Sequence, residues 1–146
     1  MENLLLVAKE SEMPLPQRTK VLAAGEIDAD DIAEVVVAAL TDRRHAGKVY
    51  EVTGPRALTF AQAVAEIAGA AGRPVNYRQI GSEQFANRMR PHVPEEYIAL
   101  LLELFAVVLD GRNSDVAPGV EQALGRPSRD FADYARRTAA TGVWRA

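Results

Sequence analysis

The chain of 146 residues contains no cysteine, which excludes disulfides, thiolate nucleophiles and cysteine-based metal sites. It has only two histidines, which argues against a histidine-rich zinc site formed within one chain. Three enzyme signatures are also missing: the G-x-G-x-x-G phosphate loop, the Tyr-x-x-x-Lys pair and the G-x-S-x-G nucleophile turn. The sequence therefore offers no recognisable phosphate cradle and no catalytic signature.

The chain also lacks a long apolar run and a strong net charge. The longest apolar stretch, residues 98–109, is interrupted by Glu103 and is too short to span a bilayer. The segment Met1–Glu10 has no basic leader and does not fit a secretory signal. The net charge of −3 argues against a nucleic-acid partner, because phosphate binding needs a basic surface. We therefore expect a soluble cytoplasmic protein without a membrane or nucleic-acid partner.

The remaining composition is that of an ordinary globular domain. Apolar residues make up 48% of the chain and charged residues 25%. A length of 146 residues suits a single domain, residues 1–146, with a hydrophobic core of its own.

Apolar periodicity and turn signals predict more helices than strands. Strands are expected at 20–24, 48–53 and 75–80, and a proline-containing loop is expected at 11–19. Helices are expected at 2–10, 28–44, 59–72, 82–89, 95–110, 120–124 and 128–138.

Several helix ends carry local signals. Asp28 or Asp30 can cap the helix that follows, because a short carboxylate accepts hydrogen bonds from the free amides of the first turn. Thr59 and Gln62 form a capping-box pattern, and Gly72 is placed as a left-handed C-cap. Ser82 and Ser128 are expected to cap the helices that follow them.

The expected helix at 95–110 is apolar on most of its circumference. We therefore expect it to be buried on several sides, or to lose one side to a partner.

The elements together indicate an α/β protein that is the helix-rich portion of a larger fold, with two or three strands and about five or six helices. So few strands make a poor independent sheet. The strand–helix–strand order from Lys48 to Ile80 could be a right-handed crossover of a parallel sheet. Because parallel sheets are covered on both faces, many helices over few strands favour one half of a larger sheet.

Few side chains are candidates for chemistry. His45 lies in a turn and could titrate near neutral pH, but a backbone hydrogen bond explains a turn histidine better. His92 lies in a loop and could line a substrate pocket, with solvent exposure as the alternative. Asp28, Asp30 and Asp31 could do acid–base work or hold a cation, but a helix start explains them without catalysis. No catalytic residue and no metal ligand is assigned.

An ordered set of motifs resembles the NmrA-like family. These are atypical short-chain dehydrogenase/reductases that include NAD(P)H-quinone-oxidoreductase-like proteins and redox-sensing regulators. The motifs, which extend over nearly the whole chain, are Met1-Glu-Asn-Leu-Leu, Ile27-Asp-Ala-Asp-Asp-Ile-Ala, His45-Ala-Gly-Lys-Val-Tyr-Glu-Val-Thr-Gly-Pro, Leu58-Thr-Phe, Gly72-Arg-Pro-Val and Gly125-Arg-Pro-Ser-Arg-Asp-Phe-Ala-Asp-Tyr.

The resemblance implies a Rossmann-like fold in which an N-terminal half binds NADP or NAD and a C-terminal half completes the sheet and forms the substrate side. This chain resembles the C-terminal half only, and the N-terminal dinucleotide-binding half is absent from it. Asn3, in the family's aromatic-x-(Glu/Asp)-Asn element, is the one residue that the resemblance places near the nicotinamide end of the cleft. The chain alone is not expected to bind the dinucleotide or to catalyse.

Two functions remain open. The chain could be the substrate-side portion of an NAD(P)-dependent oxidoreductase, active only with its missing half. It could instead be a non-enzymatic module, in which helix 95–110 and the surface uncovered by the lost half drive homodimerisation or pairing with another protein. A truncated reading frame, with Met1 as an internal methionine of a longer gene, is a third reading.

Overall fold

The structure, a computed structural model, describes residues 12–16, 27–108 and 114–144. Within these ranges lie two strands, six α-helices and one 3₁₀ turn, which confirms the expected helix-rich α/β class. The helix expected at 2–10 and the strand expected at 20–24 lie outside the described residues. The elements are β1 (Glu12–Pro16), α2 (Ala29–Thr41), η1 (Arg43–His45), α3 (Phe60–Ala71), β2 (Asn76–Ile80), α4 (Ser82–Met89), α5 (Glu95–Val108), α6 (Gly119–Leu124) and α7 (Phe131–Ala140).

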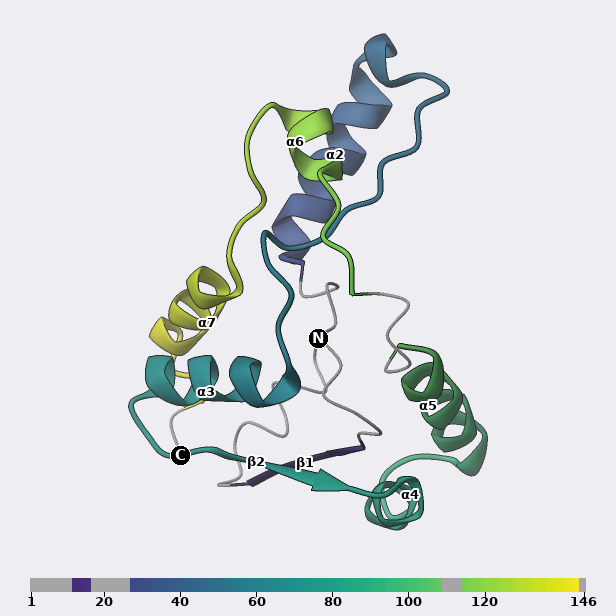
Figure 1. The fold of residues 1–146 in the computed structure, drawn as a ribbon, viewed down its shortest axis with the longest axis vertical. Helices are drawn as coiled ribbons and strands as arrows, with labels where there is room; N and C mark the ends of the chain where they lie inside the picture. Colours follow the sequence, from purple (N-terminus) through teal and green to yellow (C-terminus); the bar gives the residue numbers. More distant parts are fainter. Residues whose placement is uncertain (1–11, 17–26, 109–113, 145–146) are drawn as a thin grey trace.

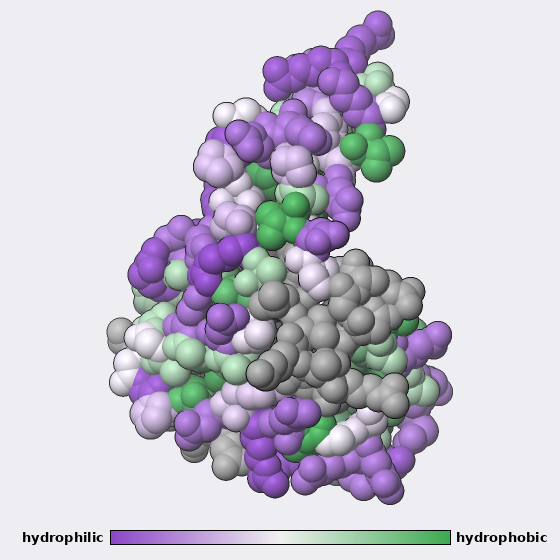
Figure 2. Space-filling model, viewed as in Figure 1, coloured by the Kyte–Doolittle hydropathy of each residue, from purple (hydrophilic) through white to green (hydrophobic). Residues whose placement is uncertain are grey.

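The elements form a narrow lobe on a broader body. Helices α2 and α6 lie together at one end of the longest axis, and the other helices and both strands form the body at the other end (Figure 1). We call residues 27–53 and 116–125 the α2–α6 lobe. The face of this lobe seen in Figure 2 is largely hydrophilic, with isolated hydrophobic side chains.

Strands β1 and β2 pair in parallel to form a two-stranded sheet. The strand expected at 75–80 is confirmed, whereas the loop expected at 11–19 is wrong over residues 12–16. Pro14 and Pro16 favoured the loop, because proline cannot donate to a sheet ladder. Prolines spaced by two place their missing donors on one side of a strand, so β1, which has one neighbouring strand among the described residues, tolerates both.

The strand expected at 48–53 is wrong. This segment makes a single isolated antiparallel bridge, between Val52 and Pro118. Beside the bridge, the Gly119 amide donates to the Glu51 carbonyl oxygen at 3.0 Å. A β-rich sequence becomes a strand only beside another strand, and the described residues provide none along most of this segment.

The larger core lies between α3, α7 and the segment that leads into β2. The capping box that opens α3 is confirmed: Gln62 N donates to Thr59 Oγ1 at 3.1 Å, and Thr59 N donates to Gln62 Oε1 at 2.9 Å. Gly72 ends the helix with φ 66°, as expected for a left-handed C-cap. The buried members of this core are Leu58, Ala63, Val64, Ile67, Val75, Phe131, Ala135 and Trp144.

A smaller core holds the α2–α6 lobe together. Val35 of α2 is buried against Val120 and Ala123 of α6. The start of α6 can lie close to residues 48–53 because position 119 is a glycine. A Cβ atom there would lie 2.0 Å from the Glu51 carbonyl oxygen.

Two helix caps differ from the expected ones. Ser82 is the first residue of α4, and Gly81 precedes it without a side-chain cap. Helix α7 begins after Asp130, whose carboxylate accepts from Ala132 N at 2.8 Å, and not after Ser128. Serine and aspartate are about equally good caps, so the sequence alone did not choose between neighbouring candidates.

Helix α5 is less buried than its sequence indicates. Ile98 is 1% exposed, but Leu100 and Leu104 on the same helix are 61% and 52% exposed. The expectation that the helix is buried on several sides is therefore wrong. The alternative, that one side is lost to a partner, stays a prediction. Among the described residues, no helix has the length and apolarity needed to cross a membrane.

Candidate functional site

The body of the protein brings the carboxyl ends of its two parallel strands to one edge, where Pro16 lies opposite Ile80. Helix α4 begins at Ser82, directly after β2, and packs against α5. In open α/β folds, ligands bind outside the carboxyl ends of the strands. This edge is therefore the first place to look for a substrate site.

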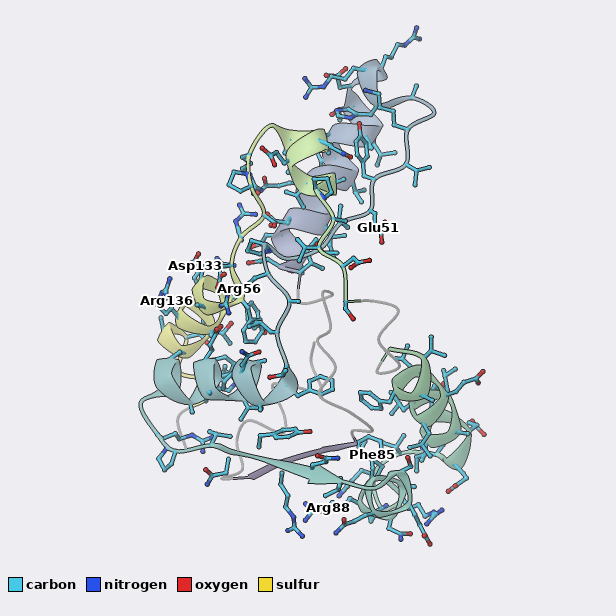
Figure 3. All side chains as sticks on the ribbon, in the orientation of Figure 1. Glu51, Arg56, Phe85, Arg88, Asp133 and Arg136 are labelled. Carbon is cyan, nitrogen blue, oxygen red and sulfur yellow. The ribbon has the colours of Figure 1, made fainter. Side chains whose placement is uncertain are left out.

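Three phenylalanine rings meet beside this edge. The ring of Phe105 on α5 is edge-on to that of Phe85 on α4, with centroids 5.5 Å apart, and to that of Phe60 on α3, with centroids 6.3 Å apart. Edge-to-face packing is a favoured geometry for aromatic pairs. Figure 3 labels Phe85 between α4 and α5. We call Phe60, Phe85 and Phe105 the aromatic cluster.

The aromatic cluster is partly open to solvent. Phe85 is buried, whereas Phe60 and Phe105 are half-buried. A half-buried ring has apolar surface that a flat conjugated molecule could cover. The cluster could therefore bind a planar aromatic ligand, but it has no group that could transfer a proton or a hydride.

His92, the candidate for a substrate pocket, lies in the turn between α4 and α5. Its backbone amide donates to the Met89 carbonyl oxygen at 2.9 Å, and the residue is exposed. It therefore belongs to the same pair of helices as Phe85 and Phe105, but its role in a pocket stays a prediction. Asn3, the candidate for cofactor binding, lies outside the described residues.

His45 is a structural histidine. It is buried, and its Nε2 atom accepts from Arg44 Nε at 3.0 Å. Because Nε2 accepts, the proton of the neutral ring lies on Nδ1, which donates to the Tyr50 hydroxyl oxygen at 2.7 Å. The structural explanation favoured by the sequence thus holds, with side chains in place of a backbone partner.

Asp31 is fully buried and is neutralised by two arginines from the other end of the chain. Its carboxylate accepts from Arg126 Nη2 at 2.8 Å, from Arg129 Nη1 at 2.5 Å and from Arg129 N at 2.7 Å. The same arginines bind Glu34, one turn further along α2, and their hydrogen bonds hold the pKa of Glu34 below its ordinary value. We call Asp31, Glu34, Arg126 and Arg129 the α2 ion-pair network.

Asp28 also has a structural role. Its carboxylate caps α2 by accepting from Asp30 N at 3.0 Å and forms an ion pair with Arg137 of α7. Burial raises the pKa of Asp28, but the hydrogen bonds from Arg137 and from the Asp30 amide outweigh burial and leave that pKa below its ordinary value. The explanation of the acidic cluster as a helix start is confirmed.

A second ion-pair group ties the turn after residue 54 to α3 and α7. Arg56 donates from Nε and Nη2 to the two carboxylate oxygens of Asp130 at 2.6 and 2.7 Å, and to Glu66 Oε1 at 2.6 Å. The hydrogen bond from Arg56 holds the pKa of Asp130 below its ordinary value. Figure 3 shows Arg56 beside α7, near the ion pair of Asp133 and Arg136.

These contacts explain most of the charged motif residues as parts of the scaffold. The described residues include no group of three or more His, Asp or Glu side chains that could hold a metal ion. The aromatic cluster is the feature that sequence reasoning missed. Its signal was weak: the chain has only four phenylalanines, and the three that meet come from different helices.

The fold defines the class of protein first. The NADPH-dependent quinone oxidoreductase of Escherichia coli matches 94% of this chain with a TM-score of 0.80 and 22% identity. The triphenylmethane reductase of Citrobacter sp. matches 96% of it with a TM-score of 0.78 and 15% identity. The chain covers 51% and 48% of these two structures. At these identities the likeness shows the fold alone, which is that of the Rossmann-like reductases.

The sequence then defines the family. The NmrA-like family matches residues 1–135, and the chain belongs to this family. An NAD(P)H azoreductase of Xenophilus azovorans is 39% identical over 96% of this chain, which covers 50% of the azoreductase. A (4-alkanoyl-5-oxo-2,5-dihydrofuran-3-yl)methyl phosphate reductase of Streptomyces griseus is 32% identical over 74% of this chain and is covered to 38%. The chain thus spans about half the length of these relatives, or less.

Proposed function

We propose that this chain is the C-terminal, substrate-side half of an NAD(P)H-dependent oxidoreductase. One observation carries the proposal: the chain is 39% identical to an NAD(P)H azoreductase over 96% of its own length but over only 50% of the azoreductase. The missing phosphate loop supports the same division, because no glycine-rich turn in the sequence could cradle a dinucleotide. The dinucleotide would then be bound by a separate half.

The acceptor in this proposal is a flat conjugated molecule that covers the half-buried rings of Phe60 and Phe105. The related proteins are named for an azo compound, a quinone and a triphenylmethane dye, all of which are conjugated electron acceptors. His92, in the turn between α4 and α5, would lie at the edge of this acceptor site. Asn3 would lie on the side of the nicotinamide.

A second function is favoured by one specific observation, the exposed apolar residues of α5. Tyr97, Leu100, Leu104 and Val107 are 42–61% exposed, and they recur at helical spacing. Such a stripe suits a non-enzymatic module that forms a homodimer or binds another protein. Light scattering separates the two functions, because a module of this kind would be dimeric before any dinucleotide-binding half is added.

The experiment that tests the proposed function supplies the missing half from a relative. The chain is mixed with the part of the Xenophilus azovorans azoreductase that it does not cover, and NADPH oxidation is followed with a quinone or an azo dye as acceptor. We expect oxidation only when both halves and an acceptor are present. NADPH oxidation at the same rate without this chain would contradict the proposal. An assembled complex of both halves that oxidises no NADPH would also contradict it.

Two variants test the acceptor site in the same assay. Phe105→Ala removes a ring of the aromatic cluster and is expected to raise the KM for the acceptor about tenfold. The stacking of a nucleobase on an aromatic side chain, a contact of similar size, is typically worth about 1–3 kcal/mol, and about 1.4 kcal/mol corresponds to a factor of ten. His92→Ala is expected to change the kinetics for the acceptor and to leave the KM for NADPH unchanged. Tyr97→Ala, on the exposed side of α5, is the matched control and is expected to change neither KM.

A further inference from the structure

One side of α2 is aliphatic throughout and open to solvent. On a helix that turns about 100° per residue, this side spans an arc of about 140° and includes no charged or polar position. Its larger residues are 40–81% exposed, with Leu40 the most exposed of them. We call the residues on this side the α2 aliphatic face; they are Ala29, Ile32, Ala33, Val36, Val37 and Leu40.

The opposite side of α2 is already occupied. Val35 packs against α6, and Asp31 is buried under two arginines. A helix at the surface of a soluble protein normally turns its charged residues outward and its apolar residues inward. Helix α2 does the reverse over part of its circumference, because it buries Asp31 and exposes Val36 and Leu40. This pattern is that of a helix packed between two layers, one of which is not part of this chain's described residues.

Residues 48–53, the extended segment beside α2, also have one packed side and one exposed apolar side chain. Tyr50 and Val52 pack on the small core of the α2–α6 lobe, whereas Val49, directly before them, is 93% exposed. The sequence of this segment is that of a strand, yet it forms one isolated bridge. Residues 48–53 thus have a strand sequence but no strand partner, and they lie beside a helix whose apolar side is exposed. This combination is typical of an α/β layer whose other strands belong to a different part of the protein.

We propose that the α2 aliphatic face is the surface on which the dinucleotide-binding half docks. This proposal rests on the proposed function. This chain covers 50% and 51% of two relatives, so each of them has a further part of about the same length as this chain. An uninterrupted aliphatic face without a single charge resembles a domain core cut in half, as expected for a permanent contact. A dinucleotide-binding half with a Rossmann-like sheet would also bring strands beside which residues 48–53 could pair, and a second copy of this chain is the alternative that the test below separates.

The test compares matched variants on two exposed apolar helices. Val36→Glu places a charge on the α2 aliphatic face, and Leu104→Glu places the same charge on α5, at starting exposures of 49% and 52%. The binding partner is the part of the Xenophilus azovorans azoreductase that this chain does not cover. We expect Val36→Glu to weaken association at least about tenfold, because charging the centre of an apolar interface leaves a buried unpaired charge. Leu104→Glu is expected to change it less than about twofold.

A labelling experiment keeps the proposal testable if Val36→Glu fails to fold. The chain has no cysteine, so Leu40→Cys and, as its control, Leu104→Cys each introduce a single thiol. We expect the partner to slow maleimide labelling of Leu40→Cys at least about tenfold, in line with a contact that excludes solvent. Labelling of Leu104→Cys is expected to keep its rate.

The outcomes separate docking from catalysis. Equal labelling of Leu40→Cys with and without the partner would overturn the docking proposal, as would a wild-type chain that does not associate. A homodimer of the chain alone that Val36→Glu dissociates would assign the face to a second copy and would also overturn it. An assembled complex that protects Leu40→Cys but oxidises no NADPH would support docking and contradict the proposed function. If Val36→Glu left the complex intact and the complex oxidised NADPH, the result would support the proposed function and contradict docking at the α2 aliphatic face.

Discussion

Replacing Asp31 by asparagine tests whether the α2 ion-pair network holds the fold together. The side chain of Asp31 is 0% exposed, and it accepts three hydrogen bonds from Arg126 and Arg129 at 2.5–2.8 Å. Asparagine keeps the shape but carries no charge, and the amide nitrogen that replaces one carboxylate oxygen cannot accept a hydrogen bond from an arginine. Glu34 would then be the only carboxylate left in the α2 ion-pair network to balance the charges of Arg126 and Arg129.

The size of the effect follows from burial and exposure. Breaking a fully buried ion pair by changing one partner costs about 3–5 kcal/mol. Here the two arginine side chains are 32% and 31% exposed, so water compensates part of the loss. We therefore expect Asp31→Asn to lower the free energy of unfolding by about 2–4 kcal/mol.

Urea unfolding followed by circular dichroism measures this change, with Asp30→Asn as the matched control. Asp30 lies in the same helical turn, but its side chain is 69% exposed and lies 3.6 Å from Arg137. An exposed pair of this kind contributes less than about 1 kcal/mol, so the control should unfold close to the wild-type midpoint. If Asp31→Asn also stayed within about 0.5 kcal/mol of the wild type, the structural role of the network would be refuted.

Three further predictions concern other contacts. The pKa of Asp130 is held below its ordinary value by its guanidinium partner, so this carboxylate stabilises the fold above about pH 4 and loses that effect as the pH falls; urea midpoints should drop on acidification, and less so in Asp130→Asn. Gly119→Ala would bring a Cβ atom within 2.0 Å of the Glu51 carbonyl oxygen and should lower the free energy of unfolding by about 1–3 kcal/mol or more, measured by thermal melting. Tyr50→Phe removes the hydroxyl that binds His45 Nδ1 and should cost about 1 kcal/mol in the same assay; no change would contradict the buried contact.

Features set by a few neighbouring residues could be predicted from the sequence. The capping box of Thr59 and Gln62, the left-handed Gly72 and the start of α2 at Asp28 depend on hydrogen bonds or backbone angles within one helical turn. Such signals do not depend on the rest of the fold, and the structure confirms each of them.

Features that depend on distant parts of the chain could not be predicted. Residues 48–53 have a strand sequence, but a strand needs a neighbour, and the described residues supply only a bridge to Pro118. Residues 12–16 were expected to be a loop because of their prolines, yet pairing with β2 on one side makes them a strand. In both cases the presence or absence of a partner strand decided the outcome.

The candidate site was even less visible in the sequence. Asp31 could be recognised as part of a helix start, but its arginine partners lie 95 and 98 residues further along the chain. The rings of Phe60, Phe85 and Phe105 meet only because three helices converge beside the carboxyl ends of the strands. No spacing rule within a single element predicts either group.

The most direct test of the central proposal is a calorimetric titration of NADPH into the chain alone and into the chain assembled with the uncovered part of the Xenophilus azovorans azoreductase. We predict no saturable binding to the chain alone and stoichiometric binding to the assembled complex. Tight, stoichiometric binding of NADPH to this chain alone would contradict the division into a dinucleotide-binding half and a substrate-side half.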